Sequence, residues 1–271
     1  MGLDWRTVLT LGSQWKMDYF KALEFDLPSA LLAQLVSLFE SMVPVPLTED
    51  SVQNVPEEQG VYQLFLDGVL VYVGKTDAEA GLKNRLLRHS KKVRSRQNLL
   101  QTQVAFKAVR LYVFTAMDLE SLLIKHYKYL SIRLSWNFSG FGSNDPGRNR
   151  DKSKIKESHF DNLYPIDLNY EATIVRSSGE ITVAAVLKQL KEQLGYTIRY
   201  MNKGGKSKTA HSDLELAVVR LRAERDSVKK ILQQIKAALG REWQITAMLG
   251  YVIIYKEREV YPHGTIIEAG E

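Results

Sequence analysis

The residues best suited to chemistry begin with two tyrosines on a predicted β-hairpin. Tyr62 ends the triplet Gly60-Val61-Tyr62, and Tyr72 begins the triplet Tyr72-Val73-Gly74. The Asp67-Gly68 pair between the two apolar runs predicts a two-residue turn, because such a turn needs positive φ. The hairpin therefore brings both phenols and both glycines close together, with Lys75 directly after them. Alone, the pattern also fits an ordinary structural hairpin.

A basic helix, predicted from Glu79 to Arg96, follows the hairpin. Helical spacing places His89 on one face with three apolar residues, and Arg85 borders the same face. Those apolar residues are Leu82, Leu86 and Val93. We expect the side chains of Arg85 and His89 to point inward or toward a cleft. Three other bases are expected to face away from it: Arg88, Lys91 and Lys92. The alternative is a histidine at the edge of the core and an arginine that reaches solvent.

Glu120 lies in the first turn of another predicted helix, which ends near Leu130. The string Thr115-x-x-Asp118 resembles a capping box at its start. Asp118 already complements the helix dipole, whereas Glu120 borders the apolar face, where an unpaired carboxylate is costly. A bound cation would relieve that cost.

Together these residues supply what phosphodiester hydrolysis needs. A hard divalent cation held by oxygen ligands stabilises developing charge, a base activates water, and a guanidinium fixes the phosphate. Glu120 is a single carboxylate, but Mg²⁺ keeps several waters and often uses only one or two protein carboxylates.

The distribution of charge points to a polyanionic partner. Between Gly81 and Arg110 there are nine bases and no acid, within a chain of net charge +6. A stretch of one sign favours nucleic acid, although an idle basic surface is the alternative. A lysine-rich loop from Lys203 to Lys208 resembles an arm that contacts the DNA backbone, or is simply exposed. The predicted DNA-contacting residues are Lys83, Arg88, Lys91, Lys92, Arg94, Arg96, Arg148, Arg150, Lys203, Lys206 and Lys208.

The composition of the 271 residues excludes several classes of protein. The chain has no cysteine, which removes disulfides, thiolate catalysis and cysteine-based zinc sites. Its five histidines show no paired metal-ligand spacing. No apolar run approaches the roughly 18 residues of a membrane helix, and no signal-peptide pattern opens the chain. We therefore expect a cytoplasmic protein without membrane contact.

Three regions are predicted, in an overall α/β (α+β) fold. Residues 1–50 form a helical extension, with a helix that starts after Leu27 and stops before Pro44. Residues 51–168 form a β-β-α-β-α core around a three-stranded antiparallel sheet. Residues 169–271 form a second small α/β domain for DNA contact or dimerisation. Within it we expect a long helix from Ser212 to Leu239 and strands from Gln244 to Tyr255.

The two triplets at this spacing resemble the signature strings of the GIY-YIG nuclease superfamily. The later Arg85, His89, Glu120 and Asn137 fall in the family's order, and the resemblance covers roughly residues 38–165. Valine replaces isoleucine in both strings, a conservative change. The glycine-rich string from Gly140 to Arg148 is similar to the type II restriction endonuclease branch, including enzymes that cut a GC-rich palindrome of the SacII kind. The same string also fits a surface connector.

The resemblance implies a role for each residue. Glu120 would hold the catalytic Mg²⁺ or Mn²⁺, and Arg85 would orient the scissile phosphate. Tyr62 would take the proton from the attacking water, assisted by His89. Tyr72 would line the site, Asn137 would brace it, and Lys75 would stabilise the phenolate or the leaving oxygen. Tyr62 needs its pKa lowered by nearby positive charge for this role, with Arg85, Lys75 and the metal as sources.

The resemblance further implies a sequence-specific endonuclease on double-stranded DNA. Cutting both strands of a palindrome needs two sites, so we expect a homodimer, accompanied by a cognate DNA methyltransferase in a restriction-modification system for phage defence. A nuclease of phage defence, repair or mobile elements with looser sequence preference is the first alternative. A DNA-binding module with an inactive core is the second.

Overall fold

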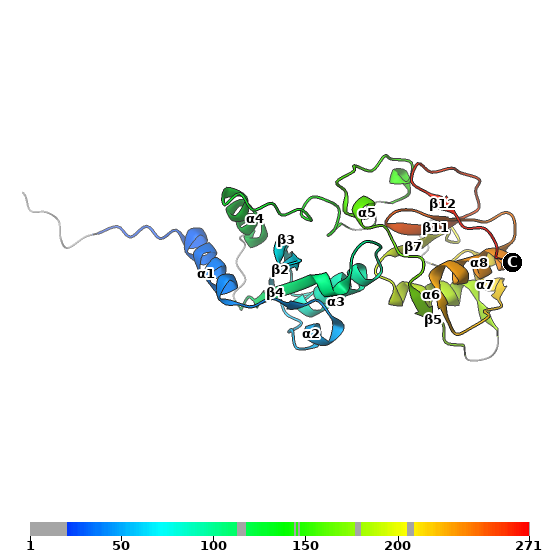
Figure 1. Cartoon of the computed structure of the whole chain (residues 1–271), viewed down its shortest axis with the longest axis horizontal. Coiled ribbons are helices and arrows are strands. Elements are labelled where there is room, and N and C mark those ends of the chain that lie inside the picture. The colour runs from blue at the N-terminus through cyan, green and yellow to red at the C-terminus, as the bar shows by residue number, and fades with distance from the viewer. Residues whose placement is uncertain are drawn as a thin grey trace, which may run out of the picture.

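The computed structural model describes residues 21–112, 118–143, 145, 147–176, 180–204 and 209–270. These residues form two four-stranded sheets, which lie side by side in Figure 1. The predicted α/β class is therefore confirmed. Within the described ranges, every helix is too short or too polar to cross a bilayer.

The first sheet and its helices come from the first part of the chain. Its elements are α1 (Leu27–Ser41), β1 (Val45–Pro46), α2 (Glu49–Gln53), β2 (Gly60–Leu66), β3 (Val69–Thr76), α3 (Leu82–Arg94), β4 (Val104–Arg110), α4 (Leu119–Tyr129) and α5 (Phe160–Leu163), with 3-10 turns at Gln101–Gln103 and Arg148–Arg150.

The second part of the chain follows. Its elements are β5 (Glu171–Thr173), β6 (Ile181–Thr182), α6 (Val183–Gln193), β7 (Thr197–Tyr200), α7 (Ser212–Leu216), β8 (Val218–Val219), β9 (Arg225–Ser227), α8 (Val228–Leu239), β10 (Gln244–Ala247), β11 (Tyr251–Tyr255) and β12 (Thr265–Ile266). Strands β7, β10, β11 and β12 form the second four-stranded sheet, whereas β5 pairs with β9 and β6 with β8 in two separate two-stranded sheets.

The predicted hairpin supplies two neighbouring strands of the first sheet, the inner strand β2 and the edge strand β3. Asp67 and Gly68 both have positive φ, at 49° and 80°, as a two-residue turn requires. The strand order is β1-β4-β2-β3, and all three pairings are antiparallel. The predicted three-stranded sheet is thus present, and the short β1 extends it beyond β4. In this register Tyr62 lies opposite Gly74, and Leu64 lies opposite Tyr72.

The two faces of this sheet bury different helices, because successive strand residues point to opposite sides. Tyr62 and Leu64 pack in one hydrophobic cluster with Leu82 and Leu86 of α3. Val61 packs in another, with the residues that α1 and α4 contribute: Leu35, Phe39, Leu119 and Leu123. The alternation therefore directs the Tyr62 ring toward the basic helix.

Helix α3 is shorter than predicted. It begins at Leu82 rather than Glu79, after Gly81 with a φ of 66°, and it ends at Arg94 rather than Arg96. The cap of α4 is Asp118, whose carboxylate accepts from the amide of Ser121 and from its hydroxyl. The expected capping box was therefore wrong in its register, and Thr115 lies outside the described residues.

The predicted helix from Ser212 to Leu239 was wrong. The chain forms α7 and then two short strands before α8 starts at Val228, capped by the Ser227 hydroxyl. Val219 and Leu221 are buried at a spacing of two, which is the period of a strand. Only after Ser227 does helical spacing return, with Val228, Ile231, Leu232 and Ile235 all buried.

The second sheet has the order β12-β10-β11-β7, in which β11 and β7 run parallel. All five residues of β11 are buried, so both faces of this sheet are covered. Val252 and Ile254 pack in the cluster that includes α6 and α8 residues. Tyr251, Ile253 and Tyr255 pack on the opposite face with Met248 and Tyr261.

Gly60, in the first triplet, tests how tightly this fold is packed. A Cβ atom there would lie 2.3 Å from the Val109 carbonyl oxygen and 2.5 Å from Leu82 Cδ1. We expect Gly60→Ala to lower the free energy of unfolding in urea by about 1–3 kcal/mol, because a packed strand and helix must shift. Lys125→Ala, at an exposed position of α4, is the control and should stay within about 0.5 kcal/mol of the wild type. Equal stability of Gly60→Ala and wild type would contradict the packing.

Candidate active site

A buried hydrogen bond joins the first tyrosine to the basic helix. The Tyr62 hydroxyl and His89 Nε2 are 2.8 Å apart, and the two side chains are 1% and 2% exposed. The other ring nitrogen of His89, Nδ1, is also buried and has no hydrogen-bond partner among the described residues. His89 therefore points inward, as its helical spacing predicted, and its partner is the Tyr62 hydroxyl.

Burial controls the protonation of this pair. It raises the pKa of Tyr62 well above 10, and the neighbouring Tyr72 phenol adds to the effect while Arg85 opposes it. Burial, followed by the charges of Lys92, Arg85 and Arg88, lowers the pKa of His89 well below 6.5. The expected lowering of the Tyr62 pKa is thus not found, because desolvation outweighs the nearby guanidinium. A neutral phenol faces a neutral imidazole.

The glycine of the second triplet makes room for this phenol. A Cβ atom on Gly74 would lie 2.5 Å from the Tyr62 hydroxyl oxygen and 2.8 Å from Tyr72 Cε1. The rings of Tyr62 and Tyr72 are 6.0 Å apart between centroids. The two triplets therefore form one packed unit, in which each tyrosine ring fits against a glycine backbone.

The glycine-rich loop completes the wall of the site, so it is not merely a connector. The Phe141 ring stacks on the His89 ring at 4.7 Å and meets the Tyr72 ring edge-on at 5.1 Å. A Cβ atom on Gly142 would lie 2.5 Å from the Tyr72 hydroxyl oxygen. Phe141 was not singled out from the sequence, although an aromatic residue between two glycines was a signal for it.

Glu120 lies half-buried at the start of α4. Burial raises the pKa of its carboxyl, while the Lys75 charge, a hydrogen bond from the Lys75 backbone amide and the Arg85 charge oppose this shift. Among the described residues, no group of three acids or histidines could enclose a metal ion. A partly desolvated single carboxylate fits a hydrated Mg²⁺ that takes its remaining ligands from water and phosphate.

Lys75 is engaged elsewhere than expected. Its Nζ lies 2.8 Å from Asp118 Oδ1 in a half-exposed ion pair. The pair lowers the pKa of Asp118 to about 2 and raises the pKa of Lys75. The structure therefore directs Lys75 to the start of α4, beside Glu120, rather than to the Tyr62 phenol.

Arg85 is the cation at the centre of this group. It is half-buried on α3, one turn before His89, and its charge acts on Tyr62, Tyr72, His89 and Glu120. Within the described ranges no hydrogen bond or ion pair engages its guanidinium. A half-buried guanidinium without a protein partner suits an anion.

Asn137 braces the edge of the sheet. Its Oδ1 accepts from the Val73 amide and its Nδ2 donates to the Val73 carbonyl, both at 2.9 Å. The Trp136 amide also donates to the Val71 carbonyl at 2.9 Å. The side chain thus takes the place of a neighbouring strand along β3, the strand that carries Tyr72.

Many of the predicted DNA-contacting bases pair within the protein. Acidic residues from other segments form ion pairs with bases of the stretch between Gly81 and Arg110. Glu57 pairs with Lys83, Glu49 with Arg94, and Asp161 with Arg96. Lys91 and Lys92 donate to the carbonyls of Glu192 and Phe141. Lys92 therefore does not face away, and burial lowers its pKa to about 7.

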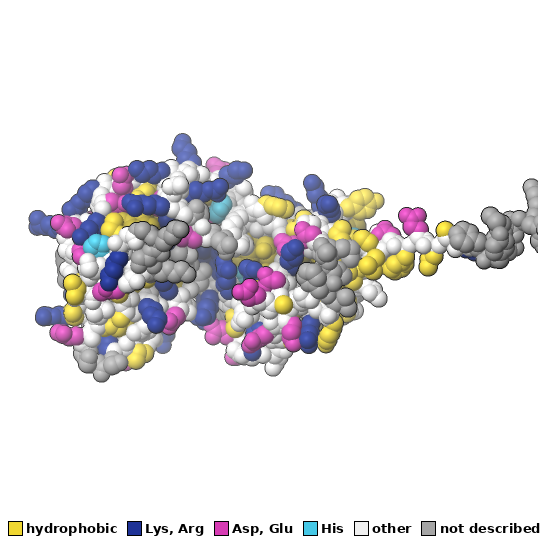
Figure 2. All heavy atoms as spheres, turned by 180° about the vertical axis from the view of Figure 1, so that it is seen from behind, with side chains coloured by type: hydrophobic (Ala, Val, Ile, Leu, Met, Phe, Trp, Pro, Cys, Tyr) yellow, Lys and Arg dark blue, Asp and Glu magenta, His cyan; other side chains and the backbone are white. Residues whose placement is uncertain are grey.

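The remaining predicted bases are more exposed. Arg88 and Arg150 are exposed, while Arg148 and Lys203 pair with Glu257 and Glu215. Lys206 and Lys208 lie outside the described residues. Figure 2 shows Lys and Arg side chains spread over the half that holds the second sheet, with acidic side chains among them. A pocket of about 640 Å³ opens between α3 and this half, and Arg88, Lys91, Arg150 and Lys191 are among its lining residues.

Comparison with known proteins agrees with the geometry of the site. Residues 70–192 match the Eco29kI GIY-YIG domain family. The match includes the second triplet, Arg85, His89, Glu120, Asn137 and the glycine-rich loop, and it continues into α6. A comparison with curated proteins finds no match. Residues 70–192 are therefore similar to a GIY-YIG nuclease domain of the Eco29kI type.

Proposed function

We propose that this protein is a sequence-specific type II restriction endonuclease that hydrolyses double-stranded DNA with the help of a divalent metal. The observation that carries the proposal is the buried Tyr62–His89 hydrogen bond, with the partly desolvated Glu120 and with Arg85, which has no partner among the described residues. These groups correspond to a proton acceptor, a phosphate ligand and a metal ligand.

The buried pair suits a proton relay. Tyr62 is protonated at neutral pH, so it can take a proton from water only as it gives up its own. His89 Nε2, 2.8 Å from the Tyr62 hydroxyl, would accept that proton in the tautomer that carries its hydrogen on Nδ1. As the water oxygen bonds to phosphorus, its proton passes to the Tyr62 oxygen and the phenol proton passes to His89. The bond to the leaving oxygen breaks, and that oxygen takes a proton from solvent.

Two further groups act on the phosphate. The Arg85 guanidinium would hold the phosphate oxygens by charge-assisted hydrogen bonds. Glu120 would hold Mg²⁺ or Mn²⁺, which when bound supplies positive charge against the charge that develops on the phosphate. Tyr72 lines the site beside Gly142, and Asn137 holds its strand in place.

We also propose how the chain is organised for this activity. Residues 51–168 form the nuclease core and residues 169–271 a second unit, because their sheets pack in separate hydrophobic clusters. Two copies of the chain would act on the two strands of a palindrome. A methyltransferase of the same specificity would protect the host's own DNA.

The metal ligand is tested by Glu120→Gln, which keeps the shape of the side chain but removes its charge. We expect cleavage of plasmid DNA with Mg²⁺ to fall to background. Lys128→Ala, at an exposed position of α4, is the control and should cleave like the wild type. Sequencing the cut ends then tests specificity, since one recurrent palindrome supports the proposal and scattered ends support a nuclease of looser preference. Cleavage that survives Glu120→Gln would overturn the assigned mechanism.

The relay is tested by Tyr62→Phe, which removes one oxygen atom and leaves the ring. We expect the single-turnover cleavage rate to fall about 10²- to 10⁴-fold, the usual contribution of general acid–base catalysis. DNA affinity, measured with Ca²⁺ in place of Mg²⁺, should stay close to that of the wild type. A rate within a few-fold of the wild type would show that another group accepts the proton.

The raised pKa of Glu120 predicts a dependence of cleavage on pH and metal. Protonated Glu120 cannot hold a cation, so kcat/KM should fall as the pH drops through the raised pKa of this carboxyl. Burial lowers the pKa of His89, which moves its own titration toward acid and away from neutral pH. A proton and a cation compete for one carboxylate. A tenfold rise in Mg²⁺ concentration should therefore move the acidic limb of the plot of kcat/KM against pH by up to about one pH unit toward acid. NaCl of equal ionic strength should not move it, and a limb unaffected by Mg²⁺ would contradict this assignment.

A further inference from the structure

The glycine-rich loop ends on the second sheet. Its first residues belong to the active site, where Phe141 stacks on His89 and the Gly142 backbone meets the Tyr72 hydroxyl. Lys92 Nζ donates to the Phe141 carbonyl. A few residues later, Asp145 and Asp151 both reach Arg199, which β7 of the second sheet carries.

The contact at Arg199 is partly buried and has several bonds. Its two terminal nitrogens donate to the two carboxylate oxygens of Asp151, whose side chain is 1% exposed. The Tyr251 hydroxyl donates to Asp151 Oδ1 at 2.7 Å, and Arg199 Nε lies 3.1 Å from Asp145 Oδ1. The guanidinium lies over the Tyr251 ring, 4.6 Å from its centroid. A planar two-point contact of this kind fixes position and orientation together.

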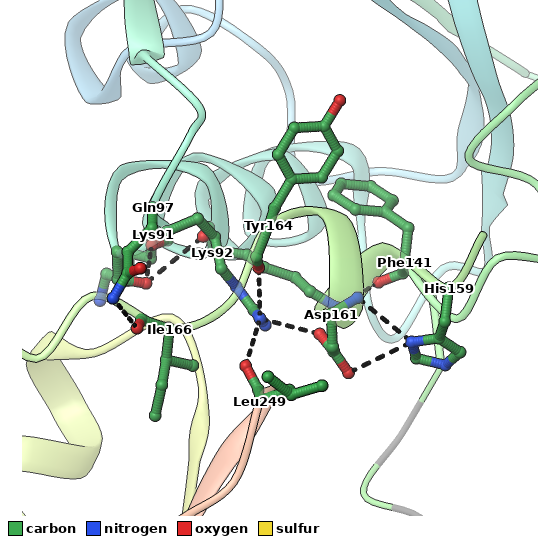
Figure 3. Close-up of polar contacts among 11 residues, drawn as sticks. Lys91, Lys92, Gln97, Phe141, His159, Asp161, Tyr164, Ile166 and Leu249 are labelled. Carbon is green, nitrogen blue, oxygen red and sulfur yellow. Dashed lines mark hydrogen bonds and ion pairs between the residues drawn. The ribbon is translucent and has the colours of Figure 1, made fainter. Parts of the chain in front are cut away.

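A second buried contact holds the same sheet to the nuclease core. Arg96, which follows α3, pairs with Asp161 at 2.8 Å and donates to the Tyr164 carbonyl at 3.1 Å. It also reaches the Leu249 carbonyl, in the turn between β10 and β11, at 3.5 Å. Figure 3 shows Asp161, Tyr164 and Leu249 converging on this guanidinium. The second sheet is therefore fixed to the core independently of the loop.

These contacts place the loop between two fixed points. At one end it must fit the Tyr72 hydroxyl and the His89 ring, and at the other it is held by Arg199. We propose that the second sheet positions the active-site loop through Arg199, which makes Arg199 a positioning residue for the nuclease reaction. The inference rests on the proposed function, because the loop matters for catalysis only if Tyr72 and His89 do.

The alternative role for the Arg199–Asp151 pair is to stabilise the fold without any effect on the reaction. A buried ion pair is often no better for stability than an apolar pair of similar size, so stability is a weak reason for it. The position of the pair favours a role in the reaction, since Asp151 and Asp145 belong to the segment that starts at Phe141, beside His89. The rate of the reaction, and not only the stability of the fold, should therefore respond to Arg199.

Arg199→Lys tests the inference, because lysine keeps the charge but cannot make the two-point contact. Hydrogen exchange of the peptides that span residues 139–151 should become faster. The single-turnover rate at saturating DNA should fall about 10- to 100-fold, as expected for a small displacement of catalytic groups. DNA affinity with Ca²⁺ should change less than about threefold. Asp151→Asn, which cannot pair with a charge, should act in the same direction.

A double substitution separates positioning from a general structural effect. If Arg199 acts through the loop on Tyr72, Arg199→Lys should cause little further loss of rate in a Tyr72→Phe background. Additive losses would overturn the inference. Arg225→Lys, in an exposed ion pair of the same half, and Ile235→Val, in its core, are the controls and should leave the exchange of residues 139–151 unchanged.

Failure of the proposed function can be distinguished from failure of this inference. If the wild-type chain does not cleave DNA, the proposed function falls, and hydrogen exchange alone then decides the attachment of the loop. Faster exchange of residues 139–151 in Arg199→Lys upholds the attachment, and unchanged exchange overturns it. If the wild type cleaves but Arg199→Lys cleaves at the same rate, the positioning role is wrong.

Discussion

The hydrogen bond between Tyr62 and His89 is the interaction on which the rest of the site depends. Both groups are buried, and a buried polar pair is tolerated only when its members satisfy each other. Desolvation keeps the phenol protonated and the imidazole neutral, so the resting pair carries no charge in the core. In the proposed relay the phenol gives up its proton to His89 only as it receives one from water, so no phenolate is formed. The glycine at position 74 and the ring of Phe141 close the space around the pair and exclude other partners.

Positive charge in this protein acts by its position in space more than by its density along the chain. The basic stretch contains no acid, yet Glu49, Glu57 and Asp161 pair with its members from other segments. What remains for an anion is Arg85, which has no partner among the described residues and whose charge acts on Tyr62, Tyr72, His89 and Glu120. A single desolvated guanidinium at the right place recognises a phosphate better than a row of solvated ones.

Local features of the chain were predictable because local physics sets them. Positive φ at Asp67-Gly68 fixed the hairpin, and helical spacing placed His89 inward. Long-range contacts were not predictable in the same way. The pairing of Lys75 with Asp118 and the raised pKa of Tyr62 depend on packing between distant segments. The helix expected from Ser212 to Leu239 is not continuous, because Val219 and Leu221 are buried at the spacing of two that is typical of a strand.

The position of the glycine-rich loop explains why a small nuclease core would need a second sheet. The edge strand β3 is already satisfied by Asn137 and Trp136, so the chain that follows has no further backbone pairing to fix it. A segment rich in glycine also loses much conformational entropy when it is held in one position. The carboxylates of the buried Asp151 and the more exposed Asp145 supply that restraint by binding Arg199 on a sheet covered on both faces. On the proposed function, the active site is therefore built by one half of the chain and held in shape by the other.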